Sequence, residues 1–257
     1  MQPNYHDFLA GVDATVVGID LTGSGARPSG WCVLRGEVAR TERLRSDGEL
    51  IERTLAESPQ VVSLDSPLSL PTGRISIDDT DPGRAVYGIM RQCERMLRRR
   101  GMGVYPCLIP SMQKLTQRGI ALASAFRTHG LPVIEGYPGG AQDVLGIPRK
   151  RAKARTCTHR LSDEMQDEAA HGCDIGTRPA RAPIGDGLKA GLIRFGIRGA
   201  FETAKVSHDE LDAITAALIG VFYVTGQFEA IGDPEEGLLI LPSNGSGATT
   251  ANTSDGV

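Results

Sequence analysis

Hydrophobic and polar positions first form a strand pattern near the start of the chain. Apolar, mostly β-branched residues fill 15–20 up to Asp20, a glycine-rich turn follows, and a second apolar run covers 30–34. Two such runs around a turn predict a β-hairpin. Because side chains alternate along a strand, we expect Val16, Gly18 and Asp20 to share one face.

The pattern then alternates between strand and helix signals. We expect strands at 38–45, 60–65 and 131–135, helices at 48–57, 84–100, 111–128 and 139–145, a glycine-rich helix or lid at 185–198, a helix from 207 to about 222, and an edge strand at 237–241. Strands that alternate with helices in this way are typical of the α/β class.

Three of the predicted strands run into a carboxylate. Asp20 ends the first, a Ser-Pro pair stops the second directly after Asp65, and Glu135 ends a third. A buried strand-end acid is costly unless its charge is compensated, and a metal ion is a common compensation. The alternative is a turn-forming acid that accepts backbone hydrogen bonds.

Two further acids lie at the start of the late helix. Ser207 and Glu210 have the spacing of a capping box, which predicts the helix start and places Asp209 and Asp212 one turn apart. The residues under this pair are small and would let the helix approach a sheet closely: Ala213, Ala216 and Gly220. The alternative is that both acids only complement the helix dipole.

Composition sets the broad class of the chain. It has 257 residues, of which 40% are hydrophobic and 23% charged, as expected for a soluble α/β protein. We predict one domain over 1–241 with basic insertions and a disordered tail over 242–257. No apolar run is long enough for a membrane helix, and the first residues do not resemble a signal peptide. Five scattered cysteines favour reduced thiols in a cytoplasmic protein.

Charge is unevenly distributed along the sequence. Residues 84–160 contain fifteen Lys and Arg but only three Asp and Glu, whereas the whole chain has a net charge of −3. A basic segment in an acidic chain predicts a polyanionic partner, here nucleic acid, DNA or RNA. The alternative is a solvated helix face formed by Arg91, Arg95, Arg98, Arg99 and Arg100. A zinc site at Cys157, His159, His171 and Cys173 is disfavoured by its spacing.

Taken together, the five acids are hard oxygen ligands that suit Mg²⁺ or Mn²⁺. Four motifs at these positions resemble an uncharacterised prokaryotic family, a domain of unknown function described as predicted ribonuclease H-like nucleases. They are Gly18-Ile-Asp-Leu, Leu64-Asp-Ser-Pro-Leu, Glu135-Gly-Tyr-Pro and His208-Asp-Glu-Leu-Asp-Ala. The last is also similar to the acidic motif of Holliday-junction resolvases of the RuvC type. The resemblance covers about 15–241.

This resemblance implies a ribonuclease H-like fold, with a five-stranded mixed sheet of order 3-2-1-4-5, helices on both faces and helical insertions. It implies a metal-dependent nuclease that hydrolyses phosphodiester bonds by a two-metal mechanism. Asp20, Asp65, Asp209 and Asp212 would bind the metal. Glu135 would be a fifth catalytic acid or would orient a base or a lysine. Resolvase-like relatives imply a homodimer.

Two other classes of protein remain open. The turn after Asp20 resembles the first phosphate loop of actin-like ATPases and sugar kinases, although those proteins need a second domain and a second glycine-rich loop. The other alternative is a catalytically inactive module that binds nucleic acid through residues 84–160. The observation that distinguishes these two classes from the nuclease is whether the acids meet in space.

Overall fold

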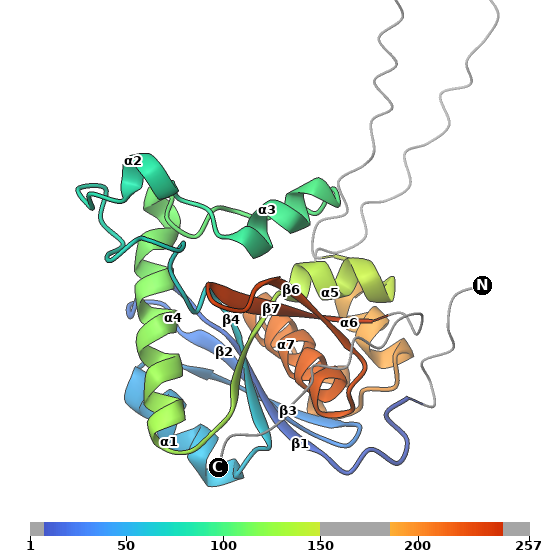
Figure 1. The fold of residues 1–257 in the computed structure, drawn as a ribbon. Coiled ribbons are helices and arrows are strands. Elements are labelled where there is room, and N and C mark those ends of the chain that lie inside the picture. The colour runs from blue at the N-terminus through green and yellow to red at the C-terminus, as the bar shows by residue number, and fades with distance from the viewer. Residues whose placement is uncertain (1–7, 150–185, 244–257) are drawn as a thin grey trace, which may run out of the picture.

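A computed structural model of the chain describes residues 8–149 and 186–243, which form an α/β structure around one mixed sheet (Figure 1). Its strands are β1 (Thr15–Asp20), β2 (Ser29–Arg35), β3 (Val38–Leu44), β4 (Val61–Asp65), β5 (Val133–Gly136), β6 (Phe228–Asp233) and β7 (Gly237–Pro242). Its helices are α1 (Asp47–Glu57), α2 (Arg84–Tyr87), α3 (Gln92–Arg99), α4 (Pro110–Thr128), α5 (Pro138–Leu145), α6 (Asp186–Arg194) and α7 (His208–Val224).

The sheet has seven strands in the order β3-β2-β1-β4-β5-β7-β6. The predicted neighbours 3-2-1-4-5 are all present, but the predicted count of five strands is wrong. Strand β7 pairs parallel with β5 and antiparallel with β6, so the strand expected at an edge lies inside the sheet. The sequence analysis missed β6, whose residues are mostly half-buried and show weak hydrophobic alternation.

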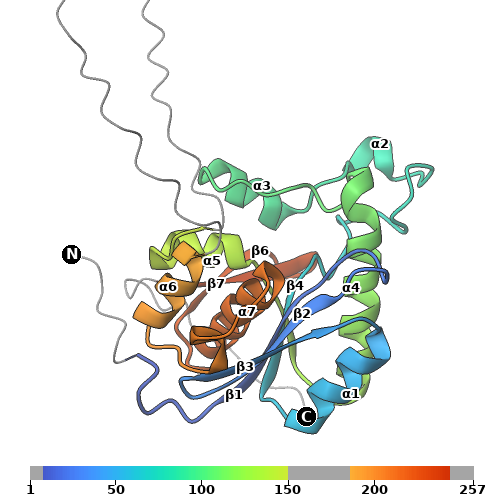
Figure 2. The ribbon, with the colours of Figure 1, turned by 180° about the vertical axis from the view of Figure 1, so that it is seen from behind.

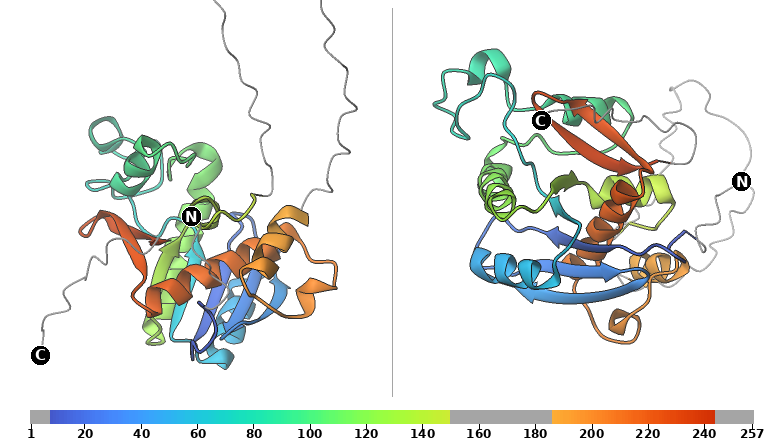
Figure 3. Two further views of the ribbon diagram at one scale, coloured as in Figure 1. Left: turned by 90° about the vertical axis from the view of Figure 1, so that its right-hand side faces the viewer. Right: turned by 60° about the horizontal axis from the view of Figure 1, so that its bottom comes forward.

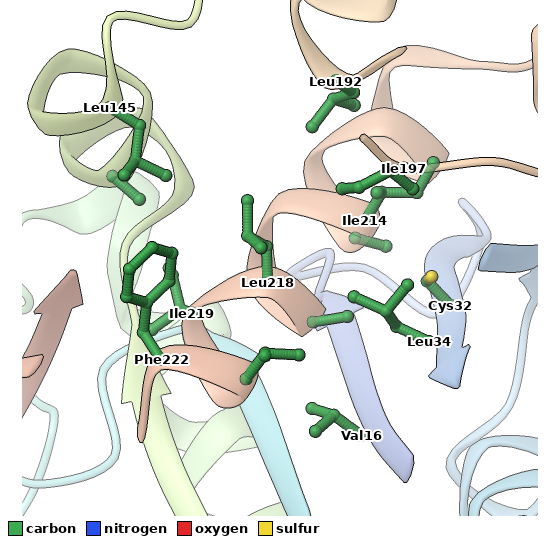
Figure 4. Close-up of a cluster of buried hydrophobic side chains, with 14 of the residues drawn as sticks. Val16, Cys32, Leu34, Leu145, Leu192, Ile197, Ile214, Leu218, Ile219 and Phe222 are labelled. Atoms are coloured by element: carbon green, nitrogen blue, oxygen red, sulfur yellow. The ribbon is translucent and has the colours of Figure 1, made fainter. Parts of the chain in front are cut away.

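Helices cover both faces of the sheet. Helices α1 and α4 lie on one face, and α7 lies on the other with α5 and α6 beside it (Figures 1 and 2). Each face has its own hydrophobic cluster, because alternate strand residues point to opposite sides. Helix α7 is buried along almost its whole length by the sheet beneath it and the helices around it (Figures 3 and 4). An apolar helix of this kind is typical of a protein core.

Small residues allow α7 to touch the sheet, as the sequence predicts. A Cβ atom on Gly18 would lie 2.2 Å from the backbone nitrogen of Ala217 and 2.3 Å from the carbonyl oxygen of Ala213. A Cβ atom on Gly30 of β2 would lie 2.0 Å from the carbonyl oxygen of Asp209. The first turn of α7 is therefore pressed against the end of the β1–β2 hairpin.

We expect Gly18→Ala to destabilise the protein by about 1–3 kcal/mol, toward the upper end, because the obstructing atoms are backbone atoms that cannot rotate away. Urea unfolding measures the effect. Gly25→Ala is a suitable control, since a Cβ atom there meets nothing within 4 Å. Equal stabilities for the two variants would contradict the close helix–sheet contact.

The predicted helix over 84–100 is two helices, α2 and α3. Gly88 has a positive φ of 72°, which ends α2, and Arg91 is the N-cap residue of α3. Val86 of α2 is exposed. Helix α4 begins at Pro110, one residue before the predicted start at 111, and has no side-chain cap.

Three further expectations concern residues at or beyond the described ranges. Pro242, assigned to a disordered tail, belongs to β7, and Ser243 donates its N–H to the carbonyl oxygen of Gln227. The four residues of the disfavoured zinc site lie outside the described residues, as do 244–257. In the part of the chain that is described, no helix is long and apolar enough to span a membrane.

Candidate active site

Two of the predicted acids are direct neighbours. Strands β1 and β4 are parallel, and Asp20 and Asp65 are paired residues at their carboxyl ends. Adjacent strands lie about 4.8 Å apart. Asp20 lies two residues after Gly18, and Asp65 lies two residues after its partner Ser63, so both acids point to the α7-facing side of the sheet. Both carboxylates are half-buried and line a cleft of about 1040 Å³. The structure therefore brings two of the three strand-end acids together.

The first turn of α7 lies beside this pair. Gly30, which touches the backbone of Asp209, is the antiparallel partner of Asp20 on β2. The predicted capping box is present: the N–H of Ser207 donates to the Glu210 carboxylate at 2.8 Å, and the N–H of Glu210 donates to Ser207 Oγ at 3.2 Å. Thr41 of β3 also donates to Glu210 at 3.0 Å, which anchors the helix start on the sheet.

Asp212 faces α5, where the Gln142 amide donates to its carboxylate at 3.0 Å and to Thr215 at 3.3 Å. These bonds fix the orientation of the carboxylate. Asp209 and Asp212 are both half-buried at the positive end of the α7 dipole, which favours negative charge. The structure thus brings the α7 acids to the same edge of the sheet as Asp20 and Asp65. Gln142 was missed, because an amide in a short helix has no distinctive sequence signal.

Glu135 occupies a different position from the other four acids. It pairs with Leu64 in the β4–β5 register, so it points to the α4 side of the sheet. Its two carboxylate oxygens accept hydrogen bonds from Arg91 at 2.6 and 2.7 Å, and one also accepts from the N–H of Leu68 at 2.9 Å. This places Glu135 in a buried ion pair, where it anchors the loop that follows Asp65.

Arg91 is the centre of that network and is only 1% exposed. It also donates to Glu94 at 2.9 Å and to Ser69 at 3.1 Å, and Glu94 accepts the N–H of Cys107 at 3.0 Å. Burial disfavours the charged guanidinium. The negative charge of Glu135 and its hydrogen bonds have the opposite effect, and the pKa of Arg91 is raised well above its usual value. Burial raises the pKa of Glu94, which Arg91 offsets only in part.

The alternative of a solvated arginine face therefore does not hold for Arg91. A run of arginines at 95–100 resembles a surface helix, and only the Arg-x-x-Glu spacing of Arg91 and Glu94 signals a helix cap. Four other arginines of the basic segment are paired with acids, three of which lie outside the segment. These pairs are Arg84–Asp79, Arg100–Glu229, Arg118–Asp47 and Arg149–Asp143. Among the described residues, these pairs offset part of the basic excess.

Aromatic and cationic side chains form the walls of the cleft. Tyr137, directly after β5, donates its hydroxyl to the carbonyl oxygen of Gly103 at 2.5 Å, and the Arg149 guanidinium lies 5.9 Å from its ring centre. Burial raises the pKa of Tyr137, the Asp65 carboxylate acts in the same direction, and Arg149 opposes both. Arg98 and Tyr105 also line the cleft.

The carboxylate oxygens of these acids suit a hard divalent cation, but they do not form a complete set of metal ligands. Among residues 8–149 and 186–243, no group of three or more His, Cys, Asp and Glu side chains is placed to hold a metal ion. Mg²⁺ is usually held by one or two carboxylates together with substrate phosphates and water, and not by an all-protein cage. The in-register pair of Asp20 and Asp65 matches this mode of binding.

The fold and the site define an α/β protein with a mixed sheet and a carboxylate pair in a cleft at the carboxyl ends of its parallel strands. No protein-family model matches the chain, and comparison with curated proteins and with solved structures found no significant match.

Proposed function

We propose that this protein is a metal-dependent nuclease with a ribonuclease H-like core. The observation that supports this most is the pairing of Asp20 with Asp65 in register on adjacent parallel strands, on one face and in one cleft. The strand order 3-2-1-4-5 around this pair agrees with the core expected from the resemblance. A solvent-accessible pair of carboxylates in a cleft is what cation-assisted phosphodiester hydrolysis requires.

Asp20 and Asp65 would hold Mg²⁺ or Mn²⁺, and Asp209 or Asp212 would complete the ligand set. When bound, such an ion activates water and neutralises charge on the phosphate. Gly30 and the capping box seat the start of α7 against the sheet, so its acids lie at the same end of the sheet as the strand acids. Gln142 orients Asp212 for this task.

Glu135 is a positioning residue in this proposal and not a ligand. Its bonds to Arg91 and to the N–H of Leu68 hold the backbone that leaves β4 directly after Asp65. Arg98 and Arg149 lie in the same cleft as the acids and supply positive charge for a phosphate backbone. The homodimer implied by the resemblance stays a prediction, which sedimentation of the purified chain checks.

The test is cleavage of labelled single-stranded and duplex DNA and RNA by the full chain with Mg²⁺, with Mn²⁺ and with EDTA. We expect cleavage of at least one substrate with a divalent cation and none with EDTA. If every substrate stays intact but nucleic acid binds with a strong salt dependence, the inactive binding module is the better description. If neither cleavage nor binding occurs, the nuclease proposal is wrong.

A further inference from the structure

The cleft contains an aromatic ring that is not buried in the hydrophobic core. Tyr105 is 70% exposed although it lines the same cleft as Asp20 and Asp65. Tyr137 lines the same cleft, close enough to Asp65 to be affected by its charge, with the Arg149 guanidinium over its ring. Flat rings and guanidinium groups of this kind are the surfaces on which unpaired bases stack.

The walls of the cleft are held together across its width. Tyr137 donates its hydroxyl to Gly103, and Arg98 donates to the carbonyl oxygen of Val104 at 3.2 Å. The segment before Tyr105 is therefore tied both to the end of β5 and to α3. At about 1040 Å³, the cleft has the size of a pocket for one large ligand. A base-paired helix exposes only base edges and phosphates, so it cannot use these rings.

We infer that the cleft takes an unpaired segment of a single-stranded nucleic acid, with one base stacked on Tyr105. Arg98 and Arg149 contact its phosphates, and the strand passes the acids at Asp20 and Asp65. This inference rests on the proposed nuclease function for the role of the acids, but the stacking on Tyr105 is a separate property of the cleft. Single-stranded DNA or RNA is therefore the preferred class of substrate.

The experiment is fluorescence anisotropy of the full chain in EDTA, with a labelled twelve-nucleotide oligothymidylate as the single strand and a blunt duplex of about the same length. We expect the single strand to bind at least about tenfold more tightly than the duplex. Tyr105→Ala should weaken single-strand binding about tenfold, the scale of one lost base–aromatic stack, whereas Tyr105→Phe keeps the ring and should stay within about twofold.

Ile75→Ala is the control, because Ile75 is an exposed apolar residue outside the cleft. Equal affinity for duplex and single strand, or unchanged binding by Tyr105→Ala, would overturn the inference. Full displacement of the oligonucleotide by thymidine monophosphate at an equal nucleotide concentration would also overturn it, in favour of a mononucleotide site. Binding that depends on Tyr105 without cleavage of any substrate would remove the nuclease proposal and leave this inference standing.

Discussion

Asp20→Asn is expected to reduce nucleic-acid cleavage by about 10²- to 10³-fold while the protein stays folded. An asparagine keeps the size of the side chain and its hydrogen-bonding capacity but removes the negative charge that binds a cation. A bound metal lowers the free energy of the transition state by several kcal/mol, because it stabilises the developing charge. Each ~1.4 kcal/mol corresponds to a factor of ten in rate. Initial rates at saturating Mn²⁺ measure the loss.

Two variants make this result specific. Asp13→Asn removes one exposed carboxylate near the start of β1 but outside the cleft, and it should leave cleavage unchanged. The double variant of Asp20→Asn and Asp65→Asn should be little worse than either single one, because paired ligands act as a unit. Additive losses, or full activity in Asp20→Asn with an unchanged melting temperature, would contradict a shared cation at this pair.

The sequence predicted much of the sheet, because strand ends have clear local signals. The Ser-Pro pair after Asp65 and the glycine-rich turn after Asp20 determine where β4 and β1 end, and parallel neighbours then bring the two acids together. The small face of α7 was predicted from the helical spacing of Ala213, Ala216 and Gly220, and in the fold Ala213 lies against Gly18 and Gly220 against Val16. Local pattern and tertiary packing agree at these positions.

Other features depend on contacts between distant segments and could not be predicted. The face to which Glu135 points depends on its register with Leu64, which a short four-residue strand does not reveal. The break between α2 and α3 comes at Gly88, and the Arg91 side chain beyond it reaches Glu135, 44 residues later in the chain. Some partners of the basic residues are also remote, as in the pair of Arg100 and Glu229.

Arg91→Ala is expected to cost about 3–5 kcal/mol of folding free energy, because it leaves two buried carboxylates without their cation. Glu135 and Glu94 are 5% and 1% exposed, so water cannot replace the lost guanidinium. Arg100→Ala is a matched control: Arg100 also bonds both oxygens of one glutamate, Glu229, but in an exposed pair that contributes no more than about 1 kcal/mol. Urea unfolding at pH 7 compares the two variants.

The pH dependence of the Arg91→Ala variant identifies the cause of its instability. Burial already raises the pKa of Glu94 in the folded protein, so the folded state binds a proton there more readily than the unfolded chain does. Without Arg91, this difference grows for Glu94. The deficit relative to the wild type should therefore shrink as the pH falls from 8 toward 5, because protonation neutralises the uncompensated charge. A deficit that stays constant over this range would instead indicate lost packing of the arginine side chain, and the ion pair would then contribute little to the stability of the cleft.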